Sequence, residues 1–301
     1  MTKETPAARV LPFRARRDYS AAAAIPVGVP AATPTQATAA STIRLPRPSG
    51  SPLHLFAGPG GSSKSFVAKY RIDRAIAAGK TLAVAELDPS KRELVRTYGP
   101  GAVMQPTSLD GAGNDVPTND PAQVVAWSIR YLEWLMSQTP PPPALMEFGG
   151  GDTALIRLVS QTPDLNTVLE AGGVSPVMWH FLTGRVEDLG TLKALEDHGF
   201  QPKATVLVFS DALLRQAAPE DVFGRVWAHP VYERAIKRGA VPIRIPALPF
   251  ELASEIDHGM RFSAYEDHMK GLGMGGLMIR VMDGWMQRME AALAPLEEYP
   301  L

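Results

Sequence analysis

The chain has 301 residues, of which 45% are apolar and 20% charged, and its formal net charge is −1. This length and composition can bury a full core, which fits one large α/β domain or two small ones. The chain contains no cysteine, so disulfides, thiolate metal sites and cysteine nucleophiles are excluded. No stretch approaches the roughly 18 apolar residues of a membrane span, and the start lacks the apolar core of a secretory signal, so we expect a cytoplasmic protein without membrane contacts.

The first fifty residues differ in composition from the rest. They are rich in Ala, Pro and Thr, and they carry seven basic residues against two acidic ones. Too few periodic apolar residues are present to offset the entropy of ordering, so we interpret residues 1–50 as a disordered arm. Its arginines suit contacts with DNA phosphates or with an acidic partner protein. A solvated tail without a partner and an organellar transit peptide are the alternatives.

A glycine-rich loop follows the first apolar run. Leu53–Ala57 predicts a buried strand, and a helical pattern begins at Phe66. Residues 58–65 between them read Gly-Pro-Gly-Gly-Ser-Ser-Lys-Ser, which is close to G-x-x-x-x-G-K-[ST] except that Ser63 replaces the second glycine. The backbone N–H groups of such a loop and the positive end of the helix dipole attract phosphate. We therefore expect a nucleotide here, and we call residues 58–65 the phosphate loop.

The residue types in the phosphate loop indicate individual roles. Lys64 would reach the terminal phosphates of a nucleotide, and the hydroxyl of Ser65 would coordinate Mg²⁺. Glycines allow the backbone to approach the anion closely. An ordinary Gly/Ser turn that contains Lys64 is the alternative interpretation. The predicted nucleotide contacts are Gly58, Gly60, Gly61, Ser62, Ser63, Lys64 and Ser65.

Acidic residues end two further predicted strands. Glu86 lies near the end of Thr81–Leu87, and Asp88 follows that run. Carboxylates at such a strand end suit holding a metal-bound water or orienting an attacking one, whereas Asp88 equally suits capping the helix that follows. Ala144–Phe148 carries Glu147 where a carboxylate can hold magnesium, usually through water.

The remaining pattern alternates strands with helices. This alternation predicts one α/β domain over residues 51–301, built from a mostly parallel sheet flanked by helices in three layers. In such sheets, ligands bind at the carboxyl ends of the strands. The further predicted strands are Pro176–Leu182, Thr205–Phe209 and Val241–Ile245; the further predicted helices are Pro121–Ser137, Val186–His198, Val231–Arg238 and Leu277–Leu293; a linker is predicted over residues 107–121.

The last predicted helix, Leu277–Leu293, has an apolar stripe rich in methionine. Membrane-binding helices need a basic polar face, but here Arg280 and Arg288 are matched by Asp283 and Glu290. We interpret the stripe as core packing or a subunit contact.

The three loops together resemble the motifs of the ParA/MinD family, the deviant-Walker P-loop ATPases that position plasmids, chromosomes and division sites. Pro59–Ser65 is similar to the family loop K-G-G-x-G-K-[ST], residues 86–90 resemble its D-x-D-P-Q switch, and Ala144–Glu147 resembles its Walker B strand. The resemblance spans about residues 52–249 and implies a P-loop NTPase fold that binds ATP and Mg²⁺. It implies catalytic roles for Lys64, Glu86 and Asp88, metal contacts from Ser65, Asp88 and Glu147, and a base contact near Ser210.

The chain departs from the family pattern at two kinds of position. The family's signature lysine, which reaches the partner's nucleotide across a sandwich dimer, is Pro59 here. Both family aspartates are replaced by the longer Glu86 and Glu147, which keeps the charge and moves it by about one C–C bond. The replacement of the signature lysine by Pro59 argues against fast hydrolysis and against the sandwich dimer.

Three functional hypotheses follow. The first is a ParA-like protein that binds Mg-ATP and hydrolyses it weakly, driving a conformational or oligomeric switch in plasmid maintenance or conjugative transfer, with a homodimer left open. The second is a non-hydrolysing P-loop interaction protein that binds DNA or a plasmid-transfer or partition protein through its basic arm. The third, a small-molecule phosphotransferase, is disfavoured because the sequence contains no arginine-rich lid.

Overall fold

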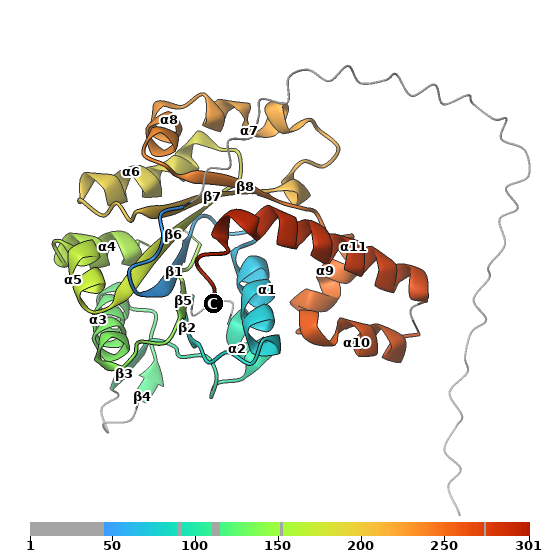
Figure 1. Ribbon diagram of the computed structural model, residues 1–301, viewed down its shortest axis with the longest axis horizontal. Helices are drawn as coiled ribbons and strands as arrows, with labels where there is room; N and C mark the ends of the chain where they lie inside the picture. Colours follow the sequence, from blue (N-terminus) through green and yellow to red (C-terminus); the bar gives the residue numbers. More distant parts are fainter. Residues whose placement is uncertain (1–44, 89–91, 110–114, 151–152, 274) are drawn as a thin grey trace, which may run out of the picture. The chain divides into compact units, whose positions relative to one another are not determined.

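A parallel sheet forms the centre of the domain. The computed structural model describes residues 45–88, 92–109, 115–150, 153–273 and 275–301. Within them lies a six-stranded sheet of order β2-β5-β1-β6-β7-β8, in which every neighbouring pair is parallel (Figure 1). The strands are β1 Ser51–Ala57, β2 Ala83–Glu86, β5 Ala144–Glu147, β6 Val174–Leu182, β7 Ala204–Ser210 and β8 Val241–Ile245. The predicted fold class is confirmed.

Helices cover both faces of this sheet, which gives three layers (Figure 1). One face packs against α1 Lys64–Ala77, α2 Glu93–Tyr98, α9 Phe250–Asp257, α10 Tyr265–Gly271 and α11 Gly276–Leu293. The other face packs against α3 Pro121–Ser137, α4 Ala154–Gln161, α5 Leu165–Ala171, α6 Leu189–Asp197, α7 Pro219–Trp227 and α8 Pro230–Lys237. Short 3-10 turns are η1 Val186–Asp188, η2 Asp211–Leu213, η3 Phe262–Ala264 and η4 Ala294–Leu296.

The strands are apolar on both sides because both sides are covered. In β6, Trp179 and Phe181 contact the α1 side, whereas Met178 and Leu182 contact the opposite side. Every residue of β6 is buried, as expected of a central parallel strand. These continuous apolar runs are the reason why the strands could be predicted from the sequence.

The structure differs from the sequence prediction in the segment before α3. A linker was expected over residues 107–121, but β3 Thr107–Leu109 and β4 Asp115–Pro117 pair antiparallel there. Strands of three residues are too short for an alternating apolar pattern to stand out from the surrounding polar residues. The helices α5, α7, α9 and α10 were also not predicted, since seven to nine residues present only about two helical turns.

Residues 45–50 belong to the packed domain, although the sequence analysis assigned them to the arm. Leu45 is buried in the core beside α1, and the backbone N–H of Gly50 donates to Ser175 Oγ at 2.8 Å. The rest of the predicted arm, residues 1–44, lies outside the described residues.

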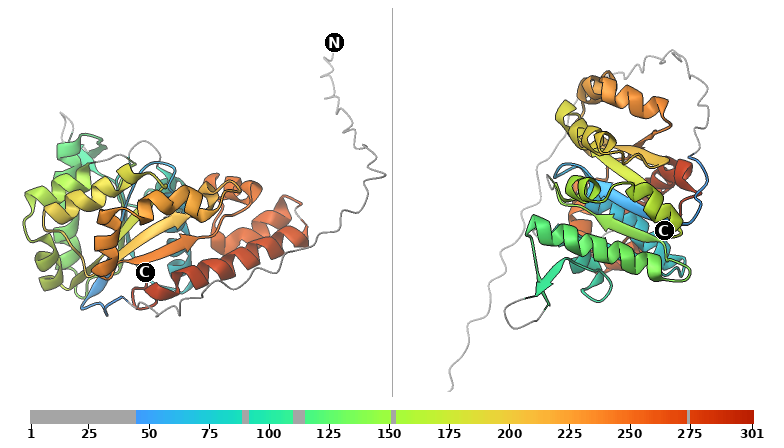
Figure 2. Two further views of the ribbon diagram at one scale, coloured as in Figure 1. Left: turned by 90° about the horizontal axis from the view of Figure 1, so that it is seen from above. Right: turned by 90° about the vertical axis from the view of Figure 1, so that its left-hand side faces the viewer.

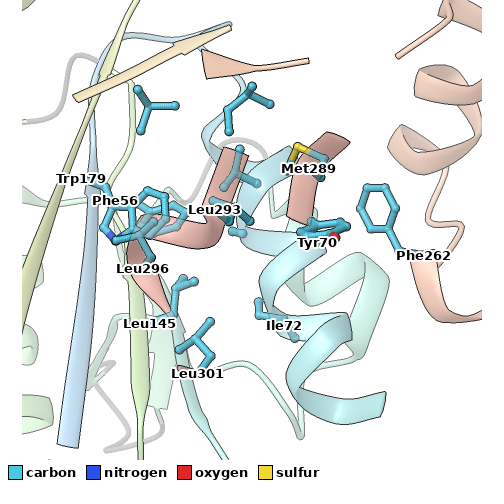
Figure 3. Packing of buried hydrophobic residues seen from close by; sticks show 14 of the residues in the cluster. Phe56, Tyr70, Ile72, Leu145, Trp179, Phe262, Met289, Leu293, Leu296 and Leu301 are labelled. Atoms are coloured by element: carbon cyan, nitrogen blue, oxygen red, sulfur yellow. The ribbon is translucent and has the colours of Figure 1, made fainter. Parts of the chain in front are cut away.

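The C-terminal helix α11 is held to α1 by aromatic side chains. Trp285 stacks on Phe262 with ring centroids 5.4 Å apart, and Tyr70 meets Trp285 edge-on at 5.6 Å. Trp285 Nε1 also donates to Pro246 O at 2.8 Å. Figure 3 shows Tyr70 between Phe262 and Met289, and Figure 2 shows α9, α10 and α11 lying together at one end of the domain. Core packing of the methionine-rich stripe is thereby confirmed, and none of the helices among the described residues is long and apolar enough to cross a membrane.

Trp285 should therefore dominate the attachment of α11. We expect Trp285→Ala to lower the free energy of unfolding by about 3–5 kcal/mol, because it leaves a large cavity. Leu277→Ala on the same helix is the matched control, since Leu277 is 78% exposed and its truncation should change stability by less than about 0.5 kcal/mol. Urea denaturation of both variants measures the difference, and equal losses would contradict this account of the packing.

Candidate functional site

The phosphate loop lies at the carboxyl end of β1, in the middle of the sheet between β5 and β6. The helix α1 begins directly after the loop, with Ser63 as its N-cap. Ser63 makes no side-chain capping hydrogen bond, and the first-turn N–H groups of a helix have no acceptor four residues earlier. Together with the helix dipole, these donors favour an anion at this end of α1.

Lys64 lies across the start of the phosphate loop. Its Nζ donates to the carbonyl oxygens of Gly58 at 2.8 Å and Pro59 at 2.9 Å, and the residue is buried. Ser62 Oγ also donates to Pro59 O, at 2.7 Å. A phosphate oxygen is a charged acceptor and forms a stronger hydrogen bond with an ammonium than a neutral carbonyl does. The lysine is therefore placed where it can exchange loop carbonyls for an anion.

Ser63, which stands where the motif has glycine, adopts a left-handed backbone with φ of 72°. This region costs an L-residue with a Cβ roughly 1–2 kcal/mol. The side chain offsets part of that cost, because Ser63 Oγ donates to Ser210 Oγ at 3.0 Å. Ser210 is the last residue of β7, so this hydrogen bond connects the phosphate loop to the end of a second strand.

Substitutions at Ser63 separate these two effects. Ser63→Ala keeps the backbone strain and loses the hydrogen bond, so we expect it to destabilise the protein by about 1 kcal/mol. Ser63→Gly also loses the hydrogen bond but relieves the strain, so it should be more stable than Ser63→Ala by roughly 0.5–1 kcal/mol. Thermal or urea unfolding tests the order, and an alanine variant as stable as the glycine variant would show that the strain is absent.

Glu147 lies beside the phosphate loop because of strand register. It is the partner of Phe56 across the β1–β5 pair, and Phe148 N donates to Phe56 O at 2.9 Å immediately beyond it. Ser65 Oγ donates to Glu147 Oε1 at 2.5 Å. The structure thus joins two of the predicted magnesium ligands.

The donor set around Glu147 fits Mg²⁺. Glu147 is 3% exposed, and within the described residues its Oε2 atom has no hydrogen-bond partner. Burial, with a contribution from the charge of Glu86, raises the pKa of Glu147 to about 8. Among the described residues no group of three or more acidic or histidine side chains could hold a metal ion by itself. Mg²⁺ commonly takes one or two protein oxygens together with waters and substrate phosphates, which is the coordination that Ser65 and Glu147 can offer.

Glu86 has a different environment from the one expected of a catalytic base. It accepts hydrogen bonds from the backbone N–H groups of Leu94 at 2.9 Å and Val95 at 3.0 Å. Its carboxylate therefore caps the N-terminus of α2, and burial raises its pKa. Glu86 is the register partner of Glu147 on the neighbouring strand, so the two carboxyl groups belong to one edge of the sheet.

Asp88 is half-buried and follows β2 by two residues. The helix that it was expected to cap begins only at Glu93, and residues 89–91 lie outside the described residues. Its predicted catalytic and metal-binding roles stay predictions.

A close backbone contact fixes the phosphate loop against the loop that follows β5. A Cβ added at Gly150 would lie 2.5 Å from Gly60 N and 2.6 Å from Gly60 Cα, closer than real atoms approach. Only glycine fits at position 150 without moving the phosphate loop. Gly150 thus has a packing role that the sequence motifs did not indicate.

A pocket of about 280 Å³ opens beside the phosphate loop. Five of the predicted contacts line it from the loop itself, namely Gly61, Ser62, Ser63, Lys64 and Ser65, and Ser210 joins them. Gly58, Gly60, Glu86, Asp88 and Glu147 are outside its lining. Most of the predicted nucleotide contacts thus meet the predicted base contact in one place, and Glu147 adjoins this pocket through its hydrogen bond with Ser65.

The opposite wall of the pocket was missed by the sequence analysis. It includes Glu93 from α2, Ile245 and Leu248 from the end of β8 and beyond, and the exposed Asp257 from α9. Apolar side chains with a few polar groups are typical of small-molecule sites. The short helix α9 gave no strong periodic signal, so nothing in the sequence pointed to Asp257.

Glu147 gives the stability of the metal-free protein a specific pH dependence. Its pKa is raised from 4.5 to about 8 on folding, so the unfolded chain ionises first and stability falls as pH rises between these values. The slope is at most ~1.4 kcal/mol per pH unit. We expect Glu147→Gln to gain stability relative to the wild type on going from pH 5.5 to 7.5, as measured by urea unfolding with a chelator present. If the difference in unfolding free energy between Glu147→Gln and the wild type is the same at both pH values, the pKa of Glu147 is not raised.

Comparisons with known proteins find distant structural likeness. No protein-family model matches the chain, and no curated protein does. Among solved structures, the chain is similar to FlhF complexed with GMPPNP and Mg²⁺, at 12% identity and a TM-score of 0.37 over 68% of this chain and 69% of that one. It is also similar to a chain of the MinC:MinD cell division complex of Aquifex aeolicus, at 11% identity and a TM-score of 0.40 over 80% and 96% of the two chains. A nucleotide-binding protein from Archaeoglobus fulgidus in complex with ADP matches at 14% identity and a TM-score of 0.38 over 70% and 87%. Since every score lies below 0.5, this likeness carries no functional argument.

Proposed function

We propose that this protein binds a nucleoside triphosphate together with Mg²⁺ at the phosphate loop. The proposal rests on one observation: Glu147, at the end of β5, lies beside Lys64 and Ser65 at the start of α1. A buried ammonium, a hydroxyl and a carboxylate with a partnerless oxygen among the described residues converge where a helix N-terminus favours an anion.

Each group has a distinct role in the proposed complex. Lys64 binds the terminal phosphates, while Ser65 and Glu147 hold the metal. Mg²⁺ supplies charge neutralisation between the phosphate oxygens. The apolar wall of the pocket receives the nucleoside, and Ser210 and Asp257 provide polar contacts that choose between bases. ATP is the nucleotide that the resemblance to the ParA/MinD family implies.

We propose further that hydrolysis is slow. Glu86 uses both carboxylate oxygens to cap α2, so this side chain is not poised to orient an attacking water. Pro59 supplies no cation where the resembling family has its signature lysine. A nucleotide-dependent conformational or oligomeric switch fits slow turnover better than a metabolic enzyme does. We propose that this switch serves plasmid maintenance or transfer, and that the basic arm binds DNA or a partner protein.

The test is calorimetric titration of Mg-ATP, Mg-ADP and Mg-GTP into the full chain, followed by phosphate release on the same samples. Lys64→Ala should weaken triphosphate binding at least tenfold, which corresponds to about 1.4 kcal/mol. Lys193→Ala is the matched control, because Lys193 is an exposed lysine paired with Asp197 on α6. Binding with slow phosphate release supports the switch, and binding without release supports the non-hydrolysing interaction protein.

Two results would overturn the nucleotide site. One is the absence of binding by any of the three nucleotides to the wild type. The other is binding that is equal in Lys64→Ala and Lys193→Ala, which would place the nucleotide somewhere else on the protein.

A further inference from the structure

A second pocket lies between α1 and the segment that follows α11, and we call it the α1–α11 pocket. It has a volume of about 290 Å³. Arg71, Arg74 and Lys80 line it from α1 and the residues just after that helix, and Glu290 and Glu297 line it from the opposite side. None of these residues contributes to the pocket at the phosphate loop.

Arg71 is a buried cation in this pocket, and the carboxylate that attracts it, Glu290, is paired closely with Arg74. Arg71 is only 9% exposed, and no ion pair joins it to an acidic side chain within 4 Å among the described residues. Its Nη2 donates to Tyr299 O at 2.7 Å, and its guanidinium lies 5.2 Å from the ring centre of Trp179. Its Nε atom is buried and has no acceptor in the described part of the chain. A guanidinium has five N–H groups, and the one on Nε is therefore buried and unused.

His54 does not supply the missing acceptor. Trp179 Nε1 donates to His54 Nδ1 at 2.9 Å, and burial together with the charge of Arg71 lowers the pKa of His54 well below its ordinary value. The ring is therefore neutral with its hydrogen on Nε2, which is the atom that lies 3.4 Å from Arg71 Nη2. Two donors face each other there. Burial accordingly lowers the pKa of Arg71 to about 10.

The charges of the pocket balance in number, but among the described residues Arg71 and Lys80 form no ion pair within 4 Å. Glu290 is already engaged, because it pairs with Arg74 at 2.7 Å and accepts a hydrogen bond from Tyr70 OH at 2.7 Å. Lys80 has no ion-pair partner within the described residues and lies at the rim. With Glu297 and the terminal carboxylate of Leu301 as the other acidic groups of the lining, three cations face three anions. An incoming oxyanion would meet Arg71 and Lys80.

The rest of the pocket is apolar. Leu293, Leu296 and Leu301 form one wall, and Ala75 of α1 lies on the other side. Figure 3 shows these three leucines between the sheet and α1. A ligand here would therefore place a short apolar body against the leucines and its charged head against the guanidinium.

We infer that the α1–α11 pocket is a second binding site, which takes a small organic anion with a carboxylate or phosphate head and a short apolar body. The guanidinium fork of Arg71 suits either head, because both present two oxygens in a plane. Arg71 lies seven residues after Lys64 on the same helix, which is about 10 Å along the helix axis. The inference does not depend on nucleotide binding at the phosphate loop.

The test uses the full chain carrying Lys64→Ala, so that the phosphate loop does not compete for phosphate. Hexanoate and hexyl phosphate are the two anionic probes, and hexanamide is the neutral control. The readout is the Nε–H signal of Arg71 in a nitrogen–proton NMR spectrum, assigned with Arg71→Lys. We expect the anions to shift this signal, with a dissociation constant of about 1 mM or lower. The double variant Arg74→Gln, Lys80→Gln should bind at least tenfold more weakly, and Arg280→Gln, an exposed arginine outside the pocket, should bind unchanged.

The outcomes are distinct. A shift with either anion and weaker binding by the double variant support the site, and the stronger probe identifies the head group. No shift with either anion overturns it, as does an equal shift with hexanamide, which would show an apolar groove without anion recognition. Unchanged affinity in the double variant also overturns it. These results can be interpreted even if the wild type binds no nucleotide, because the probes are tested on a variant that lacks Lys64.

Discussion

The parallel pairing of β1 with β5 and β6 is the constraint on which the site depends. Parallel strands end at the same edge of a sheet, so the loops that follow them meet. The β1–β5 register puts Glu147 opposite Phe56, and the ladder continues one step further through Phe148 N and Phe56 O. Ser65, at the start of α1, consequently reaches the carboxylate of Glu147. Had the register slipped by one residue, the carboxylate would point to the other face of the sheet, away from Ser65.

The helix α1, which begins at this site, also carries several buried charged side chains. Lys64, Lys69, Arg71 and Asp73 are all buried on it. A buried ion is costly unless hydrogen bonds or opposite charges compensate it, and most of these have such partners. Asp73, for instance, accepts from the backbone N–H of Phe262, where η3 begins. Arg71 is the member of this set whose compensation is least complete among the described residues, which is why the α1–α11 pocket stands out as a place for an anion.

The sequence predicted those features that depend on neighbouring residues along the chain. Apolar runs located the strands, and Gly-rich composition before Lys64 located the phosphate loop. Features that depend on contacts between distant segments could not be predicted. The acidic Glu86 looks like a catalytic group in sequence, and only the position of α2 shows that its oxygens are taken by backbone N–H groups. Asp257 enters the pocket because α9 folds back beside the sheet, which no local pattern indicates.

Lys69 shows how α2 and α9, which both line the pocket at the phosphate loop, are held together. Its Nζ lies 3.7 Å from Glu93 Oε2 on α2 and donates to Ile256 O on α9 at 3.2 Å. Glu93 lines the pocket, and so does Asp257, which follows Ile256. The lysine is 1% exposed, so water cannot replace either contact without opening the interior. A ligand that moves α2 through Glu93 must therefore either carry α9 with it or leave a buried ammonium poorly paired. Lys69 thus ties α2 to α9, and through α9 to the helices at this end of the domain.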